Sequence, residues 1–303
     1  MHTEPCNNNA WLSVQGAKWM ASEGIMERVK GYYGKFAETG GLVESCCSIM
    51  KLPGSGYAVD EGLYTLDEIF MVPMNALGLS RGCGNPLSFA TIQPGDVVVD
   101  FGCGSGIDVI LAAHKVGSQG KVIGIDVTYQ MIEQAKQAVV DAGLPDIDIE
   151  LLVTDMRKTG LPGNFADVLI SNCAINLCQD KNIVLQEAFR ILQPGGRIAV
   201  SDIVLTKDFD TELQERLRLN WAGCLGGAIA EEDYWQMAKQ AGFIDIQIVD
   251  RHILTLDELE AIACCPGKEY ITDPMEEDFT GLQGKVASIH FTAIKAPLNP
   301  DTK

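Results

Sequence analysis

The sequence has few histidines, no long apolar run and no apolar leader. Its 303 residues include only four histidines, and none of them falls in a metal-ligand spacing. No stretch approaches the roughly 18 apolar residues that a membrane-spanning helix needs. The chain also starts with a polar stretch, whereas a signal peptide has an apolar one. We therefore expect a soluble, cytoplasmic protein with no membrane partner.

The sequence is also poor in positive charge. It has 23 Lys and Arg residues against 41 Asp and Glu residues, which gives a formal net charge of −18. Proteins that bind nucleic acids do so through basic surfaces that neutralise phosphates. We therefore expect no nucleic-acid partner. The hydrophobic fraction of 47% and the charged fraction of 21% are ordinary for a globular protein, which excludes a disordered chain or a coiled coil.

Ten cysteines are the unusual feature of the composition. A large cytosolic chain does not need disulfides, and several cysteines are expected to be small buried apolar residues. That interpretation fits poorly for the adjacent pairs Cys46–Cys47 and Cys264–Cys265. Thiolates prefer soft metals and metalloids, so a site for such a centre is the alternative. A zinc site built from C-x-x-C pairs is excluded, because the sequence contains no such pair.

From about residue 94 the sequence alternates between two patterns. Short β-branched runs predict strands, and apolar residues at helical spacing predict amphipathic helices between them. The predicted strands are 97–101, 121–125, 147–153, 166–171, 197–201, 243–249 and 286–294. The predicted helices are 107–116, 128–142, 181–192 and 231–241. This alternation predicts an α/β fold: a Rossmann-like parallel sheet with helices on both faces and the ligand at the carboxyl ends of the strands.

The remaining segments suggest two parts. Residues 1–90 are interpreted as an N-terminal segment of helices and loops that carries Cys46 and Cys83. Residues 91–303 would form the main domain with a C-terminal extension. Insertions at about 205–230 and 251–285 interrupt the alternation, and we expect them to cover or flank the ligand edge.

The strongest motif is VVVDFGCGSG at 97–106, where a strand leads through Gly102, Gly104 and Gly106 into a helix. Glycines allow a tight turn and a close approach of the backbone to a ligand. NAD sites usually space these glycines as G-x-G-x-x-G. The G-x-G-x-G spacing is instead typical of sites for S-adenosylmethionine, which is the cofactor that we expect.

Three aspartates stand where that cofactor needs partners. Asp126 ends the second predicted strand and can bind the ribose hydroxyls. Asp155 follows the third strand and can accept a hydrogen bond from the adenine amino group. Asp100 stands where we expect the ammonium group of the cofactor.

Further segments carry a resemblance to one family. They are GYYGK at 31–35, SCC at 45–47, RGCGNP at 81–86, ISNCAINL at 170–177, PGGRIAVSDIV at 194–204 and W-x-x-C at 221–224. Together with the glycine motif, these segments resemble the arsenite S-adenosylmethionine methyltransferases over about residues 29–250. The resemblance implies a class I methyltransferase fold. It also implies methyl transfer from S-adenosylmethionine to trivalent arsenic, which detoxifies the metalloid.

The resemblance also implies the residues of the site. Cysteine thiolates would hold arsenic(III) and form the catalytic set: Cys46 (with Cys47 as the alternative), Cys83, Cys173 and Cys224. Cys173 and Cys224 would form the central pair, while Cys46 and Cys83 would belong to a mobile N-terminal part. The cofactor set would include Val127, Met131, Met156 and Asn172 as well as the residues named above. The substrate would be arsenite or a thiol conjugate of it, and the reductant a thiol of the glutathione or thioredoxin type.

Several points stay open from the sequence. Residues 157–163 depart from the family pattern on the adenine side of the cofactor. Asn172 could orient a ligand or only bind a neighbouring turn. A methyltransferase for a small organic acceptor, or a metalloid-binding protein without enzymatic activity, is the alternative function.

Overall fold

A computed structural model of the chain describes residues 24–40, 63–144, 146–206, 209, 223–263 and 279–297. The predicted ligand Cys46, its alternative Cys47 and the pair Cys264–Cys265 lie outside these residues. Among the described residues, no helix is both long and apolar enough to cross a membrane.

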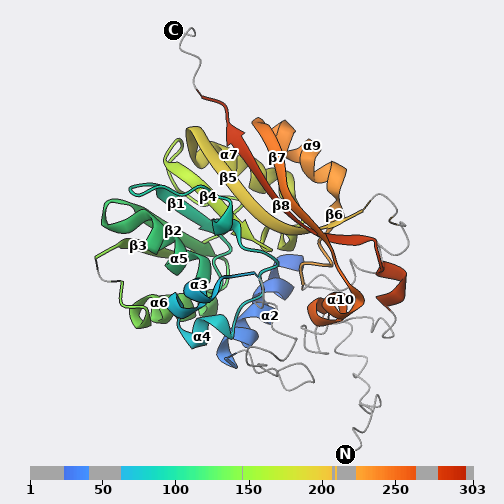
Figure 1. Cartoon of the computed structure of the whole chain (residues 1–303), viewed down its shortest axis with the longest axis horizontal. Helices are drawn as coiled ribbons and strands as arrows, with labels where there is room; N and C mark the ends of the chain where they lie inside the picture. Colours follow the sequence, from blue (N-terminus) through green and yellow to red (C-terminus); the bar gives the residue numbers. More distant parts are fainter. Residues whose placement is uncertain are drawn as a thin grey trace, which may run out of the picture.

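One sheet organises the fold (Figure 1), with the strand order β3-β2-β1-β4-β5-β8-β7. Its strands are β1 (Val97–Phe101), β2 (Lys121–Asp126), β3 (Asp148–Val153), β4 (Ala166–Asn172), β5 (Leu192–Leu205), β7 (Phe243–Ile253) and β8 (Val286–Lys295). The two-residue strand β6 (Ile229–Ala230) pairs with the end of β5. The seven predicted strands are therefore confirmed.

The direction of one strand differs from the prediction of a parallel sheet. Strands β1 to β5 pair in parallel, but β8 is antiparallel to both of its neighbours, β5 and β7. The chain leaves β7 and re-enters β8 at the same end of the sheet, so no crossover connection is made. The β5–β8 pairing runs from Arg197 opposite Ile294 to Leu205 opposite Val286, which extends β5 beyond its predicted end.

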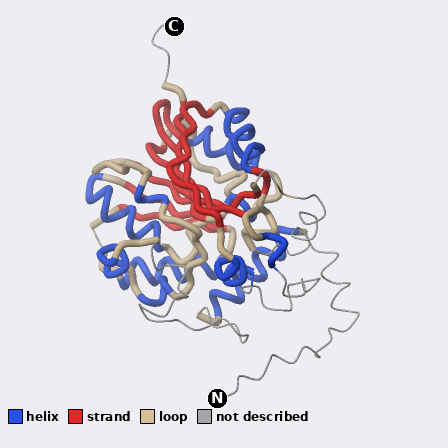
Figure 2. Tube along the Cα trace, turned by 45° about the vertical axis from the view of Figure 1, so that its right-hand side comes forward, coloured by secondary structure: helices blue, strands red, loops and turns tan. Residues whose placement is uncertain are grey.

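Helices cover both faces of the sheet, as predicted (Figure 2). One face carries α5 (Ile107–Val116) and α6 (Tyr129–Asp141), and the other carries α7 (Lys181–Ile191) and α9 (Glu231–Ala241). The N-terminal part contributes α2 (Ile25–Glu38), α3 (Leu66–Met71) and α4 (Met74–Leu77). The shorter elements are η1 (Pro86–Ser88), η2 (Gly117–Gln119), η3 (Ile175–Leu177), α10 (Leu256–Ala263) and η5 (Phe279–Leu282).

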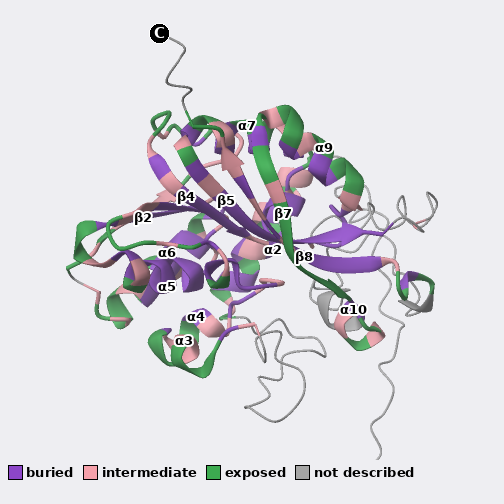
Figure 3. Ribbon diagram, turned by 45° about the horizontal axis from the view of Figure 1, so that its top comes forward, coloured by how far each residue is buried: buried purple, intermediate pink, exposed green. Residues whose placement is uncertain are grey.

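The sequence builds two cores because successive side chains of a strand point to opposite faces. In β1, Val98 packs with α5, whereas Val99 and Phe101 join the core under α7. In β4, Ile170 packs in the core under α5, and Leu169 packs in the core under α7. Figure 3 shows the central strands as buried and the outer faces of the helices as exposed.

A third apolar cluster lies at the carboxyl end of β5, past the last residue pair that β5 makes with β4. It includes Ile203 and Leu205 of β5, Val286 of β8 and Leu259 of α10. The insertion expected at 251–285 starts later than predicted, because residues 251–253 still belong to β7. Helix α10 then follows. The cluster matters for the site because it also contains cysteine side chains.

The aromatic contacts of β8 predict a measurable stability effect. Phe291 is fully buried, and its ring centroid lies 5.0 Å from that of Trp235 and 5.5 Å from that of Tyr234. Phe291→Ala should lower the free energy of unfolding by roughly 3–5 kcal/mol through the cavity it leaves. Val249→Ala, at a half-exposed position of β7, should cost less than about 1 kcal/mol. Denaturant titration measures both, and equal losses would contradict this description of the core.

Candidate functional site

The glycine turn after β1 adopts backbone angles that favour glycine. The φ angles of Gly102, Gly104 and Gly106 are +77°, +50° and +90°. A Cβ atom on Gly102 would overlap the Cβ of Ala174, so a side chain at Gly102 would clash. The backbone N–H of Gly104 donates to the Asp126 carboxylate at 3.1 Å, which ties the turn to the end of β2.

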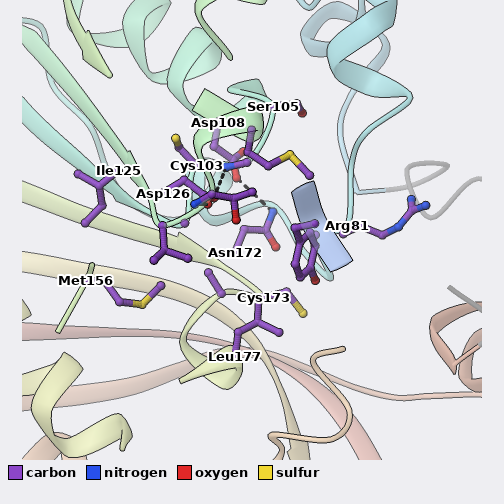
Figure 4. Close-up of a pocket in the computed structure, with 18 of the residues that line it drawn as sticks. Arg81, Cys103, Ser105, Asp108, Ile125, Asp126, Met156, Asn172, Cys173 and Leu177 are labelled. Atoms are coloured by element: carbon purple, nitrogen blue, oxygen red, sulfur yellow. Dashed lines mark hydrogen bonds between the residues drawn. The ribbon is translucent and has the colours of Figure 1, made fainter. Parts of the chain in front are cut away.

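A pocket opens between this turn and the carboxyl ends of β2, β3 and β4 (Figure 4). Eight of the ten predicted cofactor residues line it: Gly102, Gly104, Asp126, Val127, Met131, Asp155, Met156 and Asn172. Asp100 and Gly106 are not part of its lining. Gly106 instead lets α5 pack on α6, because a Cβ there would come within 3.1 Å of the Cβ of Ala135.

The charge beside the pocket suits a cationic ligand. Asp100 is buried, and its Oδ2 atom has no hydrogen-bond partner among the described residues. Burial raises the pKa of Asp100 well above its ordinary value, and the charges of Asp108 and Asp126 raise it further. A buried oxygen without a partner is costly, and a cation beside it would relieve that cost. The residues present therefore fit S-adenosylmethionine, which carries a sulfonium and an ammonium group.

Asp155 is held by a neighbour that the sequence motif did not suggest. The Arg157 guanidinium donates to both carboxylate oxygens, with Nη2 at 2.6 Å from Oδ2 and Nε at 3.0 Å from each oxygen. Burial alone would raise the pKa of Asp155, but the bonds from Arg157 lower it overall. The backbone N–H of Arg157 also donates to Oδ1 at 2.8 Å, so these contacts already occupy the lone pairs of the carboxylate. A hydrogen bond from an adenine amino group to Asp155 would have to share an oxygen with them. That contact stays a prediction.

Three of the four predicted thiols are neighbours. Cys83, Cys173 and Cys224 share the third apolar cluster, although 141 positions separate the first from the last (224 − 83). The Cys173 thiol lies within hydrogen-bonding reach of the thiols of both Cys83 and Cys224. Burial raises the pKa of Cys173 and that of Cys83, so both thiols are protonated near neutral pH.

Cys173 joins the pocket to the thiol cluster. It lines the pocket and also belongs to the cluster. Its φ angle of +59° is rare for a residue with a side chain, and its backbone N–H donates to the Ser201 carbonyl at 2.8 Å. Such strain often marks a functional position.

Other cysteines stand apart from this cluster. Cys103 packs in the core under α5, and Cys178 packs in the core under α7. Among the residues that the structure describes, no three His, Cys, Asp or Glu side chains already form a metal site. The three clustered thiols would therefore have to draw together to hold a metalloid ion.

Some pocket residues are not predicted by the sequence motifs. Tyr33 of α2, Arg81 and Asp108 line the pocket without an expected role. Tyr33 stands within the GYYGK segment, and Asp108 follows the glycine motif in the first turn of α5. The motifs could have indicated both residues, but only the folded chain shows that α2 reaches the pocket.

Comparisons with known proteins agree with this geometry. Residues 92–242 match a family described as a methyltransferase domain. The chain is 34% identical over 240 residues to the arsenite methyltransferase of Halobacterium salinarum, covering 76% of this chain and 60% of the relative. It is 29% identical over 248 residues to the arsenite methyltransferase of Mus musculus, covering 78% of this chain and 63% of the relative. The chain thus spans somewhat under two thirds of the length of these relatives.

A solved structure is also similar. The arsenic(III) S-adenosylmethionine methyltransferase of Chlamydomonas reinhardtii superposes with a TM-score of 0.64 at 28% identity. The match covers 77% of this chain and 73% of that chain. The resemblance inferred from the sequence motifs is therefore confirmed, as is the methyltransferase fold.

The glycine turn predicts how one substitution affects the cofactor. Gly102→Ala should weaken binding of S-adenosylhomocysteine about tenfold or more, since each 1.4 kcal/mol of strain is a factor of ten. Gly95→Ala is a matched control, because Gly95 also has a positive φ of +90° but has no atom within 4 Å of the place where a Cβ would lie. Isothermal titration calorimetry measures both affinities. Unchanged binding by Gly102→Ala would contradict the assignment of the turn.

The burial of Cys83 predicts a pH dependence. The thiolate is the reactive form, and a raised pKa leaves little thiolate at neutral pH. The alkylation rate of Cys83 by iodoacetamide should therefore keep rising, up to about tenfold per pH unit, beyond the ordinary cysteine pKa of about 8.5. Mass spectrometry at Cys83 follows the rate, with a short cysteine peptide as the reference. A plateau below the pH at which the peptide levels off would show that the pKa is not raised.

Proposed function

From the premise that the chain belongs to the S-adenosylmethionine-dependent methyltransferases and resembles the arsenite methyltransferases, we propose that it methylates trivalent arsenic. The observation that carries the proposal is the double position of Cys173. It lines the pocket that fits the cofactor and shares an apolar cluster with two further thiols. A substrate held by these thiols would lie beside the cofactor.

Arsenic would be held by Cys83, Cys173 and Cys224, with Cys46 as a further predicted ligand outside the described residues. Soft thiolates suit a soft three-coordinate centre better than carboxylates or imidazoles do. Each As–OH group of arsenous acid would be replaced by an As–S bond, with one molecule of water released. The apolar side chains around the thiols, such as Ile203 and Leu225, would keep water away from these bonds.

The residues of this chain would act chiefly by positioning. S-adenosylmethionine, when bound, supplies a methyl group on a positively charged sulfur. The carboxylates of Asp108 and Asp126, which line the pocket, would stabilise its positive charge. The arsenic lone pair is itself the nucleophile, so no protein base is needed for the methyl transfer. Holding two reactants in line can contribute on the order of 7–11 kcal/mol to the lowering of the barrier.

A reductant follows from the electron balance of this proposal. Forming the As–C bond uses the arsenic lone pair, which takes arsenic formally from +3 to +5. Two electrons must return before another methyl group is added, and two thiols supply them by forming a disulfide. We expect a thiol of the glutathione or thioredoxin type. The five cysteines in the described part of the chain are free thiols, which agrees with a reducing cytoplasmic setting.

The test uses labelled S-adenosylmethionine, arsenite and a thiol reductant, followed by chromatography of the arsenic species. The wild-type protein should yield methylated arsenicals, and Cys173→Ser or Cys224→Ser should abolish them. Cys178→Ser should still yield methylated arsenicals, because this thiol lines the cofactor pocket but packs outside the thiol cluster. Full activity in both cluster variants would reject the proposal. Methylation of an organic acceptor that survives these changes would favour the alternative enzyme.

A further inference from the structure

An asparagine at the end of β4 bonds the segment that carries Cys83. We propose that Asn172, the last residue of β4, is a positioning residue that holds Cys83 in the thiol cluster. This inference rests on the proposed function and deepens it. Asn172 directly precedes Cys173, so one short stretch of β4 would set the places of two arsenic ligands.

The amide of Asn172 bonds the backbone on both sides of the Cys83 Cα atom. Its Oδ1 atom accepts from the backbone N–H of Cys83 at 3.0 Å and from that of Gly84 at 3.2 Å. Its Nδ2 atom donates to the Gly84 carbonyl at 2.7 Å. Three bonds from one side chain therefore fix the turn that presents the Cys83 thiol.

The amide nitrogen of Asn172 also contacts two residues that line the pocket, Tyr64 and Asp108. Nδ2 also donates to the Tyr64 hydroxyl at 3.1 Å and to the Asp108 carboxylate at 3.2 Å. The Tyr64 hydroxyl donates to the other oxygen of Asp108 at 2.8 Å. Because an amide nitrogen has only two hydrogens, these contacts occupy its donor capacity and leave none for a cofactor. Asn172, a predicted cofactor residue, lines the pocket, but its amide bonds groups of the protein itself.

Close packing explains why glycines flank Cys83. A Cβ atom on Gly82 would lie 2.5 Å from Nδ2 of Asn172, and one on Gly84 would overlap Nε2 of His290. The Cys83 carbonyl accepts from the Ser288 hydroxyl at 2.9 Å. The segment therefore sits directly on β4 and β8, where larger residues would displace it.

Two variants disturb this contact from opposite sides. Asn172→Asp keeps the shape and one acceptor oxygen, but it turns a second oxygen toward the Gly84 carbonyl and Asp108. Gly82→Ala adds a methyl group against the Asn172 amide. Asn176→Ala is the control: this buried asparagine, four positions along, donates to the Ile203 carbonyl at 2.6 Å instead of to the Cys83 segment.

The experiment is alkylation of the full chain with iodoacetamide, with and without arsenite and without cofactor, mapped by mass spectrometry. In the wild type and in Asn176→Ala, arsenite should protect Cys83, Cys173 and Cys224. In Asn172→Asp and Gly82→Ala it should still protect Cys173 and Cys224 but not Cys83. The apparent arsenite affinity should fall roughly 10–100-fold, as for the loss of other residues that orient metal ligands.

Protection of Cys83 by arsenite in both variants would overturn the positioning role. If arsenite is not a substrate at all, the variants should still change the alkylation rate of Cys83 relative to the control, which separates this inference from the proposed function. A measurement on the wild type is independent of how the variants fold. The amides of Cys83 and Gly84 should exchange slowly with deuterium, and fast exchange would also overturn the role.

Discussion

The backbone at Cys173 is the constraint on which the proposed chemistry depends. This residue leaves β4 in a left-handed conformation, and a hydrogen bond to the Ser201 carbonyl of β5 holds it there. In this conformation the Cys173 side chain both lines the pocket and belongs to the apolar cluster. The strained residue thus follows β4, and the hydrogen bond that compensates for its strain comes from the neighbouring parallel strand β5.

Two environments of opposite character meet at this residue. On one side stand buried carboxylates, and the charges of Asp108 and Asp126 add to the raised pKa of Asp100. On the other side, thiols lie among aliphatic side chains such as Ile203 and Val286. The acidic side suits a sulfonium, and the apolar side suits a soft neutral centre bound to sulfur. The boundary between them is where a methyl group would pass.

The sequence predicted the individual strands and the glycine turn, but it did not predict the contacts between segments that lie far apart in the chain. The spacing of β-branched runs predicted every strand of the seven-stranded path, and the glycine motif with Asp126 predicted the pocket, because both are local patterns. The antiparallel direction of β8 depends on pairing between residues far apart in the chain, which no local pattern contains. The same holds for the approach of α2 to the pocket. The pairing of Arg157 with Asp155 was also missed, although only two positions separate them.

The most direct test of the account is X-ray absorption at the arsenic edge, on wild-type protein with one equivalent of arsenite and no cofactor. We expect three sulfur atoms as the nearest neighbours of arsenic and no oxygen. In Cys173→Ser, we expect oxygen to replace sulfur among these neighbours. Oxygen neighbours in the wild type, or an unchanged three-sulfur shell in Cys173→Ser, would contradict the claim that these thiols form the site.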